Sequence, residues 1–182
     1  SALTNWSGFD WLERMFDSLG IRYHPVQFGA PDDPEIDTWH GWRSWHIDCN
    51  IVPLKEGLAM YNPDEPPVTD EFWDLFEKND WDLIPAARPT HVYDHDYYLS
   101  GPDGGHGKSW ISMNTFSIDP ETVVVEAHET AYINQLRDLG FDVIPVPYEK
   151  VVPLGGALHC TTLDVKRQGG LEDYFPNQVD GY

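Results

Sequence analysis

Three stretches of the chain share one pattern of apolar and polar positions. Each begins with apolar residues at helical spacing, passes through a break, and continues as a short extended apolar segment that reaches a proline. The stretches start at Phe9, Glu71 and Tyr132. The breaks are Gly20, Asp80 and Gly140, and the prolines are Pro25, Pro85 and Pro145. Both series repeat at an interval of sixty residues, and such fixed spacing indicates repeated supersecondary units.

The first repeat shows how the pattern predicts a helix. Its apolar positions are Leu12, Met15, Phe16 and Leu19. These positions share one face of a helix, so we expect Ser7 to be the N-cap and Gly20 to end the helix in the left-handed conformation. In the second repeat Thr69 is the expected N-cap. The sequence therefore predicts three short amphipathic helices.

Short β-rich segments lie between these helices. The predicted strands are 49–54, 58–61, 81–84, 122–126 and 143–146. The first two flank a hairpin-like break at 55–57. Strands that alternate with helices predict an α/β protein, here one domain over residues 1–182 made of modules related by pseudo-rotation. The long polar loops at 29–40 and 87–108 are of a length that compact domains usually reserve for function.

Composition narrows the class of partner. The chain has 182 residues, a hydrophobic share of 41% and a formal net charge of −20 with 11 lysines and arginines. It is long and apolar enough for a core, whereas so few basic residues disfavour nucleic acid and anionic membrane surfaces. No apolar run is long enough to span a membrane. The absence of a signal-peptide pattern and the presence of only two cysteines predict a cytoplasmic protein with reduced thiols.

Two short motifs are candidates for chemistry. They are "WHIDCN" at 45–50 and "GGALHC" at 155–160, and each follows a helix–strand unit. Equivalent positions in pseudo-symmetric modules point toward a common axis, so we expect His46 and Cys160 to meet in one pocket. The thiolate of a free cysteine is a nucleophile when a neighbouring group favours the anion. Asp48 is expected on the same strand face as His46, where its carboxylate could clamp a cationic group, since a guanidinium offers a fork of donors that matches it. The alternative is that Cys160 is a buried, inert cysteine.

Metal and phosphate sites are weaker interpretations of the sequence. A zinc site would draw on His46, Cys49, His159 and Cys160, but no Cys-x-x-Cys pair is present and two adjacent ligands close a tetrahedron poorly. "HVYDHDYY" at 91–98 resembles a metal cluster in composition, and we expect it to be a polar loop at the pocket mouth instead. "GPDGGHGKS" at 101–109 lacks the spacing of a phosphate-binding loop. The prediction is therefore no metal and no cofactor.

The chain resembles the glycine amidinotransferase family from near residue 4 to near residue 175. The segments that carry the resemblance are "TNWSGFDWLERMF", "HIDCNIVPLKEGLAMYNPD", "KSWISMNTFSID" and "LGGALHCTTLDVKRQGGLEDYF". The third resembles a Trp-x-Ser-Met-Asn strand of the family, so we expect a strand there. The resemblance implies a five-bladed α/β propeller of ββαβ modules, of which this chain would be about half. It further implies that Cys160 is a nucleophile that takes an amidino group from L-arginine or a similar guanidine. His46 would be the general acid and base, Asp48 would hold the guanidinium, and a small amine would be the acceptor.

Three departures from the family pattern leave other functions open. Relatives carry about as much chain again upstream, including a further catalytic carboxylate, so we expect a complementing N-terminal half or an oligomer. Glu65 stands where relatives have an arginine that pairs with the substrate carboxylate, and Lys108 lies near the place of a serine that helps. A catalytically impaired pseudoenzyme or structural protein is therefore one alternative. A guanidine hydrolase of the deiminase type is another, because the same cysteine and histidine permit it.

Overall fold

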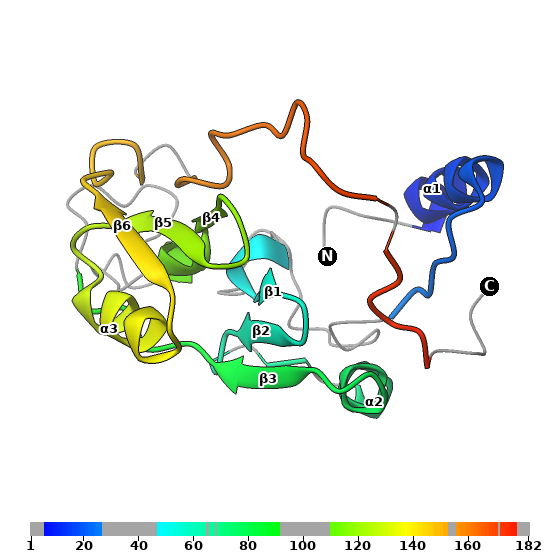
Figure 1. Ribbon diagram of the computed structural model, residues 1–182, viewed down its shortest axis with the longest axis horizontal. Helices are drawn as coiled ribbons and strands as arrows, with labels where there is room; N and C mark the ends of the chain where they lie inside the picture. Colours follow the sequence, from blue (N-terminus) through cyan, green and yellow to red (C-terminus); the bar gives the residue numbers. More distant parts are fainter. Residues whose placement is uncertain are drawn as a thin grey trace.

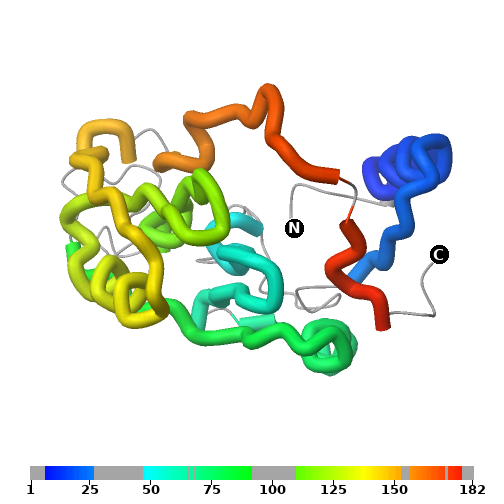
Figure 2. The backbone as a smooth tube through the Cα atoms, in the orientation of Figure 1, coloured from blue at the N-terminus to red at the C-terminus, as the bar shows by residue number. Residues whose placement is uncertain are grey.

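The computed structural model describes residues 6–26, 47–64, 66–67, 69–91, 110–152, 156–170 and 172–177. Figure 1 shows the helices and strands, and Figure 2 traces the backbone in the same view. The α-helices are α1 (Trp6–Leu19), α2 (Asp70–Lys78) and α3 (Thr130–Asp138), and the short 3-10 helices are η1 (Ile47–Cys49) and η2 (Trp110–Met113). The strands are β1 (Ile51–Lys55), β2 (Leu58–Tyr61), β3 (Asp82–Pro85), β4 (Phe116–Ser117), β5 (Thr122–Glu126) and β6 (Asp142–Val146).

Two ββαβ modules account for all the described strands. The first has the strand order β1-β2-β3 and the second has β4-β5-β6. In each, the first two strands are antiparallel and the third is parallel to the second. A parallel partner requires a crossover connection, which α2 provides in the first module and α3 in the second. The chain is therefore α/β, as predicted, and its repeat is a three-stranded sheet with one helix.

Each helix is followed by a residue with positive φ at the predicted break. The φ values are 64° at Gly20, 58° at Asp80 and 89° at Gly140. Glycine adopts this conformation without the steric cost of a Cβ atom. Asp80 is the one non-glycine residue with positive φ in the described part of the chain, and aspartate is among the residues that tolerate it best. The three breaks predicted at sixty-residue intervals are thus confirmed.

The main core lies between the two sheets and α3. Its buried members are Val52, Leu54, Leu58, Met60, Ala86, Met113, Val123, Val125, Tyr132, Ile133, Leu136, Phe141 and Val143. Both modules contribute, so they form one packed unit. A second cluster joins Ala59 to Phe72 and Phe76 of α2, with Phe175 packed against it. The Phe175 ring stacks on that of Trp81 with centroids 5.2 Å apart, so the C-terminal segment closes the outer side of α2.

Helix α1 and the C-terminal segment lie beside each other, away from the two sheets (Figures 1 and 2). Arg22, which follows α1, forms an ion pair with Asp173 and donates to the carbonyl of Phe175. Trp11 and Leu19 of α1 remain largely exposed. In the described part of the chain, every helix is too short or too polar to cross a membrane.

Three local predictions differ from the structure. Helix α1 begins at Trp6, so Ser7 lies in its first turn and is not the N-cap. Asp48 was predicted on a strand, but it lies in the 3-10 helix η1. The segment Trp110–Met113 was likened to a strand, and it forms the 3-10 helix η2. In both 3-10 segments the short alternation of apolar and polar residues is too brief to separate a strand from a tight turn. Thr69 is the N-cap of α2, as predicted.

Candidate active site around Cys160

Cys160 lies in a tight turn that follows the second module. Its thiol is free and exposed, whereas Cys49 is buried beside Ile111, Val152 and Ala157. The backbone at Gly156 lies against the side chain of Cys160. A Cβ atom added to Gly156 would lie 2.7 Å from the Cβ of Cys160 and 3.2 Å from its Sγ. Only glycine leaves room for this approach. The interpretation of Cys160 as a buried structural cysteine is therefore wrong.

Asn114 organises the turn that carries the thiol. This buried residue follows η2, and its Oδ1 accepts hydrogen bonds from the backbone N–H groups of Ala157 (3.1 Å) and Cys160 (3.0 Å). Its backbone carbonyl accepts from the N–H of His159 at 3.2 Å. A buried residue whose side-chain amide satisfies two backbone donors, and whose carbonyl satisfies a third, fixes the local conformation, because each donor would otherwise lose its partner. The position of Cys160 therefore depends on a residue of the second module.

Asp48 of the first module reaches the same place. Its Oδ2 accepts a hydrogen bond from Nδ2 of Asn114 at 2.7 Å. The same oxygen lies 2.9 Å from Nδ1 of His159 and 3.8 Å from Sγ of Cys160. Its other oxygen, Oδ1, is buried and has no hydrogen-bond partner among the described residues. A buried carboxylate oxygen without a donor is costly.

The structure brings together two of the five residues proposed from the sequence. Cys160 and Asp48 meet, although 112 positions separate them. His46, Glu65 and Lys108 lie outside the described residues, so the meeting of His46 with Cys160 stays a prediction. Sequence reasoning missed the roles of Asn114 and His159. "ISMNTF" carried part of the resemblance, but nothing in its spacing indicated that the amide of Asn114 spans both segments.

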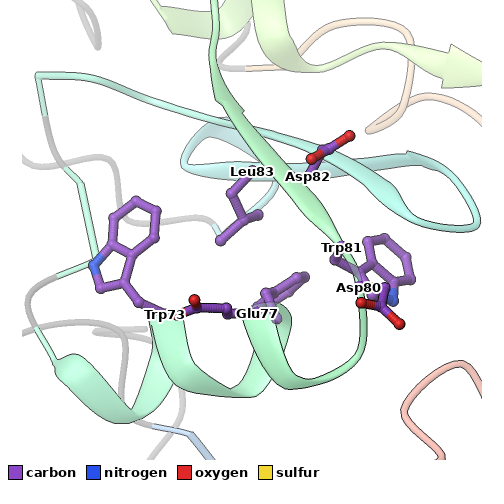
Figure 3. Close-up of a pocket in the computed structure, with 7 residues that line it drawn as sticks. Trp73, Glu77, Asp80, Trp81, Asp82 and Leu83 are labelled. Carbon is purple, nitrogen blue, oxygen red and sulfur yellow. The ribbon is translucent and has the colours of Figure 1, made fainter.

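A hollow on the outer side of the first module is separate from this site. It is lined by Trp73, Phe76, Glu77, Asp80, Trp81, Asp82 and Leu83, between α2 and β3 (Figure 3). Its lining is aromatic and acidic and includes neither cysteine nor histidine. It shares no residue with the surroundings of Cys160.

Two curated proteins that match the chain are amidinotransferases. The chain is 33% identical to the mitochondrial glycine amidinotransferase of Gallus gallus over 175 residues. This matched region is 96% of this chain and 36% of that protein. It is 30% identical over 177 residues to the L-arginine:L-lysine amidinotransferase of Pseudomonas savastanoi pv. phaseolicola, with 96% of this chain and 42% of that protein covered. No family model matches the chain.

A solved structure gives the same likeness in three dimensions. The inosamine-phosphate amidinotransferase of Streptomyces griseus superposes with a TM-score of 0.70 and 31% identity, over 94% of this chain and 43% of that one. The chain thus spans between about a third and about half of the length of the relatives that it matches.

Proposed function

Because this chain belongs to the amidinotransferase family and matches its C-terminal half, we propose that it supplies the nucleophile of an enzyme that transfers an amidino group. The observation that carries the proposal is the exposed thiol of Cys160 beside Asp48, whose buried Oδ1 has no donor among the described residues. The substrate class is a guanidine such as L-arginine, and the acceptor is a small amine. The curated relatives act as amidinotransferases by name.

The reaction proceeds in two substitutions at one carbon. Sγ of Cys160 attacks the guanidinium carbon, the bond from that carbon to the side-chain nitrogen of arginine breaks, and the amine leaves with a proton from His46. An amidino-cysteine remains. The acceptor amine then attacks the same carbon, gives a proton back to His46, and the carbon–sulfur bond breaks to restore the thiolate. Dividing one difficult substitution into two easier steps is the advantage of covalent catalysis, and neither step calls for a cofactor.

Asp48 holds the guanidinium during both steps. A carboxylate matches the fork of N–H donors that a guanidinium presents. Oδ2 of Asp48 is already engaged by Asn114, so Oδ1 is the oxygen for the substrate. The carbon of a guanidinium held by Asp48 would then lie near the sulfur of Cys160, which is 3.8 Å from Oδ2.

Glu65 and Lys108 tune which guanidine binds. Glu65 stands where relatives have an arginine, and it repels a substrate carboxylate if the loop keeps its place. Lys108 supplies a compensating positive charge. The donor is therefore arginine with a rearranged carboxylate grip, or a guanidine that lacks the carboxylate.

The remaining half of the fold completes the site. We propose that the two modules belong to a five-bladed α/β propeller, and that the rest of the protein or a second chain supplies the missing blades and the further carboxylate. Sheet edges left open by half a propeller favour such association. The chicken relative is a mitochondrial protein by name, so a cytoplasmic location for this chain stays a prediction.

The test is a covalent adduct on Cys160 in the complemented protein. The chain is combined with the preceding half, incubated with L-arginine, quenched in acid and measured by intact mass and peptide mapping. We expect one amidino group on Cys160, no adduct in Cys160→Ser, and an unchanged adduct in the control Cys49→Ser, because Cys49 is buried.

The products separate the alternatives. Release of the amidino group onto an added amine supports transfer. Urea or a citrulline-type product without an amine indicates the hydrolase. An unmodified Cys160 in a folded, complemented protein that binds arginine would make the chain a pseudoenzyme.

A further inference from the structure

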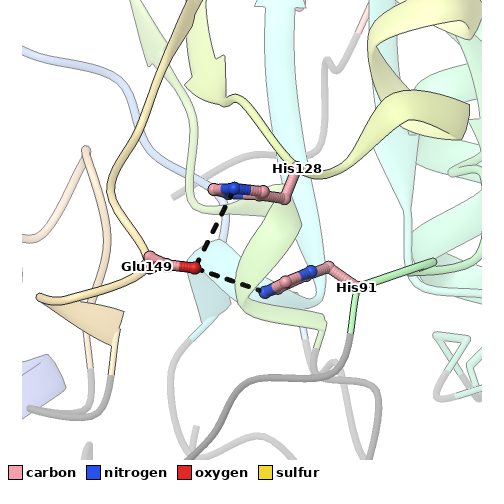
Figure 4. A group of neighbouring side chains, drawn as sticks. All are labelled: His91, His128 and Glu149. Carbon is pink, nitrogen blue, oxygen red and sulfur yellow. Dashed lines mark ion pairs between the residues drawn. The ribbon is translucent and has the colours of Figure 1, made fainter.

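A second group of polar side chains lies where three connections of the fold meet. His91 follows β3, His128 follows β5 and Glu149 follows β6 (Figure 4). One ligand-type atom from each of these residues lies within 4.8 Å of the other two. We propose that this cluster is a binding site for a divalent transition-metal ion, with zinc as the best match. The site shares no residue with the surroundings of Cys160 and goes beyond the proposed transfer reaction.

The distances fit an ion better than direct contact between the side chains. Oε2 of Glu149 lies 3.8 Å from Nε2 of His91 and 3.9 Å from Nε2 of His128. These separations are too long for hydrogen bonds. Zinc binds nitrogen and oxygen ligands at about 2.0–2.2 Å, so ligand atoms of a tetrahedral site lie roughly 3.3–3.6 Å apart. Glu149 needs to approach each histidine by only a few tenths of an ångström, whereas the two histidine nitrogens, which lie within 4.8 Å of each other, would have to close by up to about an ångström around an ion.

His128 is oriented as metal-binding histidines are. Its Nδ1 lies 2.8 Å from Oε1 of Glu126, a buried carboxylate. In the neutral ring this pairing favours the proton on Nδ1, so that Nε2, which lies 3.9 Å from Oε2 of Glu149, is the ligand atom. A carboxylate behind the far nitrogen of a ligating histidine is the usual outer partner in zinc sites, where it fixes the tautomer and the ring. The ring of His91 stacks on that of His128, with centroids 4.6 Å apart.

Two buried glutamates hold the three segments together. Glu126 accepts hydrogen bonds from the N–H of His128 at 2.6 Å and the N–H of Tyr148 at 3.1 Å, so it ties the second ligand to the segment that carries the third. Glu129 accepts from the N–H of Thr90 at 2.8 Å, which anchors the residue before His91. A site with such support is positioned before the ion arrives.

The net charge of the chain and the exposure of the three side chains are consistent with a bound cation that has one coordination position open to water. The chain carries a net charge of −20, which raises the local concentration of cations. Two imidazoles and one carboxylate are the ligand types that suit zinc. All three side chains remain partly exposed, so a fourth position is left for water. The exposed Lys150 lies 3.0 Å from Oε1 of Glu149, the oxygen that faces away from the histidines, and it competes weakly for that carboxylate.

The site is connected to the thiol turn through Tyr148. The hydroxyl of this residue lies 2.6 Å from Oγ1 of Thr161, the neighbour of Cys160. An ion on Glu149 would therefore hold the segment that braces the turn. Its role is structural, because the ion would tie together three connections that are far apart in sequence.

The test is calorimetric titration of the tag-free chain with zinc chloride, carried out in the Cys160→Ser variant so that the thiol contributes no ligand. We expect one zinc ion per chain and a rise in the melting temperature. His128→Ala and Glu149→Gln should each weaken binding by about tenfold or more, and Glu126→Gln by about 10- to 100-fold through loss of the outer partner. The matched control is His24→Ala, which removes another histidine with a glutamate partner, Glu71 at 3.2 Å.

The results of these titrations decide whether the metal site exists. Unchanged affinity in His128→Ala and Glu149→Gln, with both variants folded by circular dichroism, would overturn the proposal. So would the absence of saturable heat from the parent variant. Cobalt(II) gives an independent readout: visible d–d bands in the Cys160→Ser protein that disappear in His91→Ala support the site, whereas bands that survive in His91→Ala contradict it.

Discussion

Helix α3 is buried more deeply than α2, although both occupy the same place in their modules. Tyr132, Ile133 and Leu136 of α3 are at most 4% exposed, while the best-buried residues of α2, Phe72 and Phe76, are 7% and 8% exposed. Helix α3 packs into the core that both sheets share, whereas α2 packs in a separate cluster with the C-terminal Phe175. The second module therefore has the more deeply buried helix, and it carries Asn114 and the buried glutamates.

Truncation of one leucine in each helix should show the largest difference. Leu136→Ala removes a side chain with no exposed surface, so unfolding free energy should fall by about 2–5 kcal/mol. Leu75→Ala makes the same chemical change in α2, where Leu75 is only partly buried, and should cost about 1 kcal/mol. Urea denaturation followed by circular dichroism measures both. Equal losses would contradict a core weighted toward the second module.

In both modules an asparagine follows the 3-10 helix that precedes the first strand, but the hydrogen bonds of the two asparagine side chains differ. Asn50 and Asn114 each donate their N–H to the carbonyl three residues earlier, that of Ile47 and of Ile111, at 2.9 Å. The side-chain oxygen of Asn114 also accepts hydrogen bonds from the backbone N–H groups of Cys160 and Ala157. The same turn thus forms a strand entrance in one module and supports the thiol in the other.

Asn114→Ala should loosen the thiol turn. It leaves two backbone donors without their acceptor, which costs about 1–3 kcal/mol, and it frees Cys160 from its fixed position. The rate of thiol modification by a disulfide reagent should change several-fold for Cys160, with Cys49 protected by burial. Asn50→Ala is the matched control. An equal change of rate in both variants would show that the turn does not depend on Asn114.

The residue with positive φ that follows each helix also differs between the modules, with a smaller expected effect on stability. Gly140→Ala places a Cβ at φ 89° with nothing within 4 Å, so its cost of about 1–2 kcal/mol is purely conformational. Asp80 already carries that strain at φ 58°. Asp80→Gly should therefore stabilise the protein by up to about 1 kcal/mol. The melting temperature should fall in the first variant and rise in the second, and a fall in both would refute this account.

The fold was predictable where local pattern decides it. The strand at 122–126 has the predicted bounds, because the alternation of apolar and polar residues that predicts a strand depends on a few neighbouring residues. All three breaks have positive φ, because the preference for the left-handed conformation is also local. Asp48 and Trp110–Met113 were misplaced on strands because a 3-10 turn in the same short pattern is stabilised by tertiary contact, here between the two modules.

The site was predictable only in part. The resemblance named Cys160 and Asp48, and the structure places them 3.8 Å apart. It could not indicate Asn114, which bonds Cys160 from 46 positions away and Asp48 from 66. The histidine and glutamate cluster was missed for the same reason, since "HVYDHDYY" suggested a local group while the partners of His91 come from two other connections. His46, Glu65 and Lys108 stay predictions.

The hairpins of the two modules give the last and smallest contrast. The turn of the first module uses Gly57 with φ 76°. The turn of the second uses Asp119, whose Oδ1 accepts from the N–H groups of Glu121 and Thr122 at 2.8 Å each. The bond from Glu121, followed by those from Thr122, holds the pKa of Asp119 below its ordinary value of 3.8. We therefore expect acid to weaken the turn of the second hairpin through Asp119.

The folded state binds the Asp119 proton more weakly than the unfolded state does. Its contribution to stability is therefore complete above the unfolded pKa and is lost as the pH falls through the lower folded pKa. Asp119→Asn removes the charge that these bonds favour, so the variant should be less stable than the parent at neutral pH and equally stable in strong acid. Urea midpoints between about pH 2 and pH 6 measure the difference. Glu121→Gln removes a charge from the same turn and keeps both bonds, so a matching loss of acid sensitivity there would assign the effect to net charge and not to the turn.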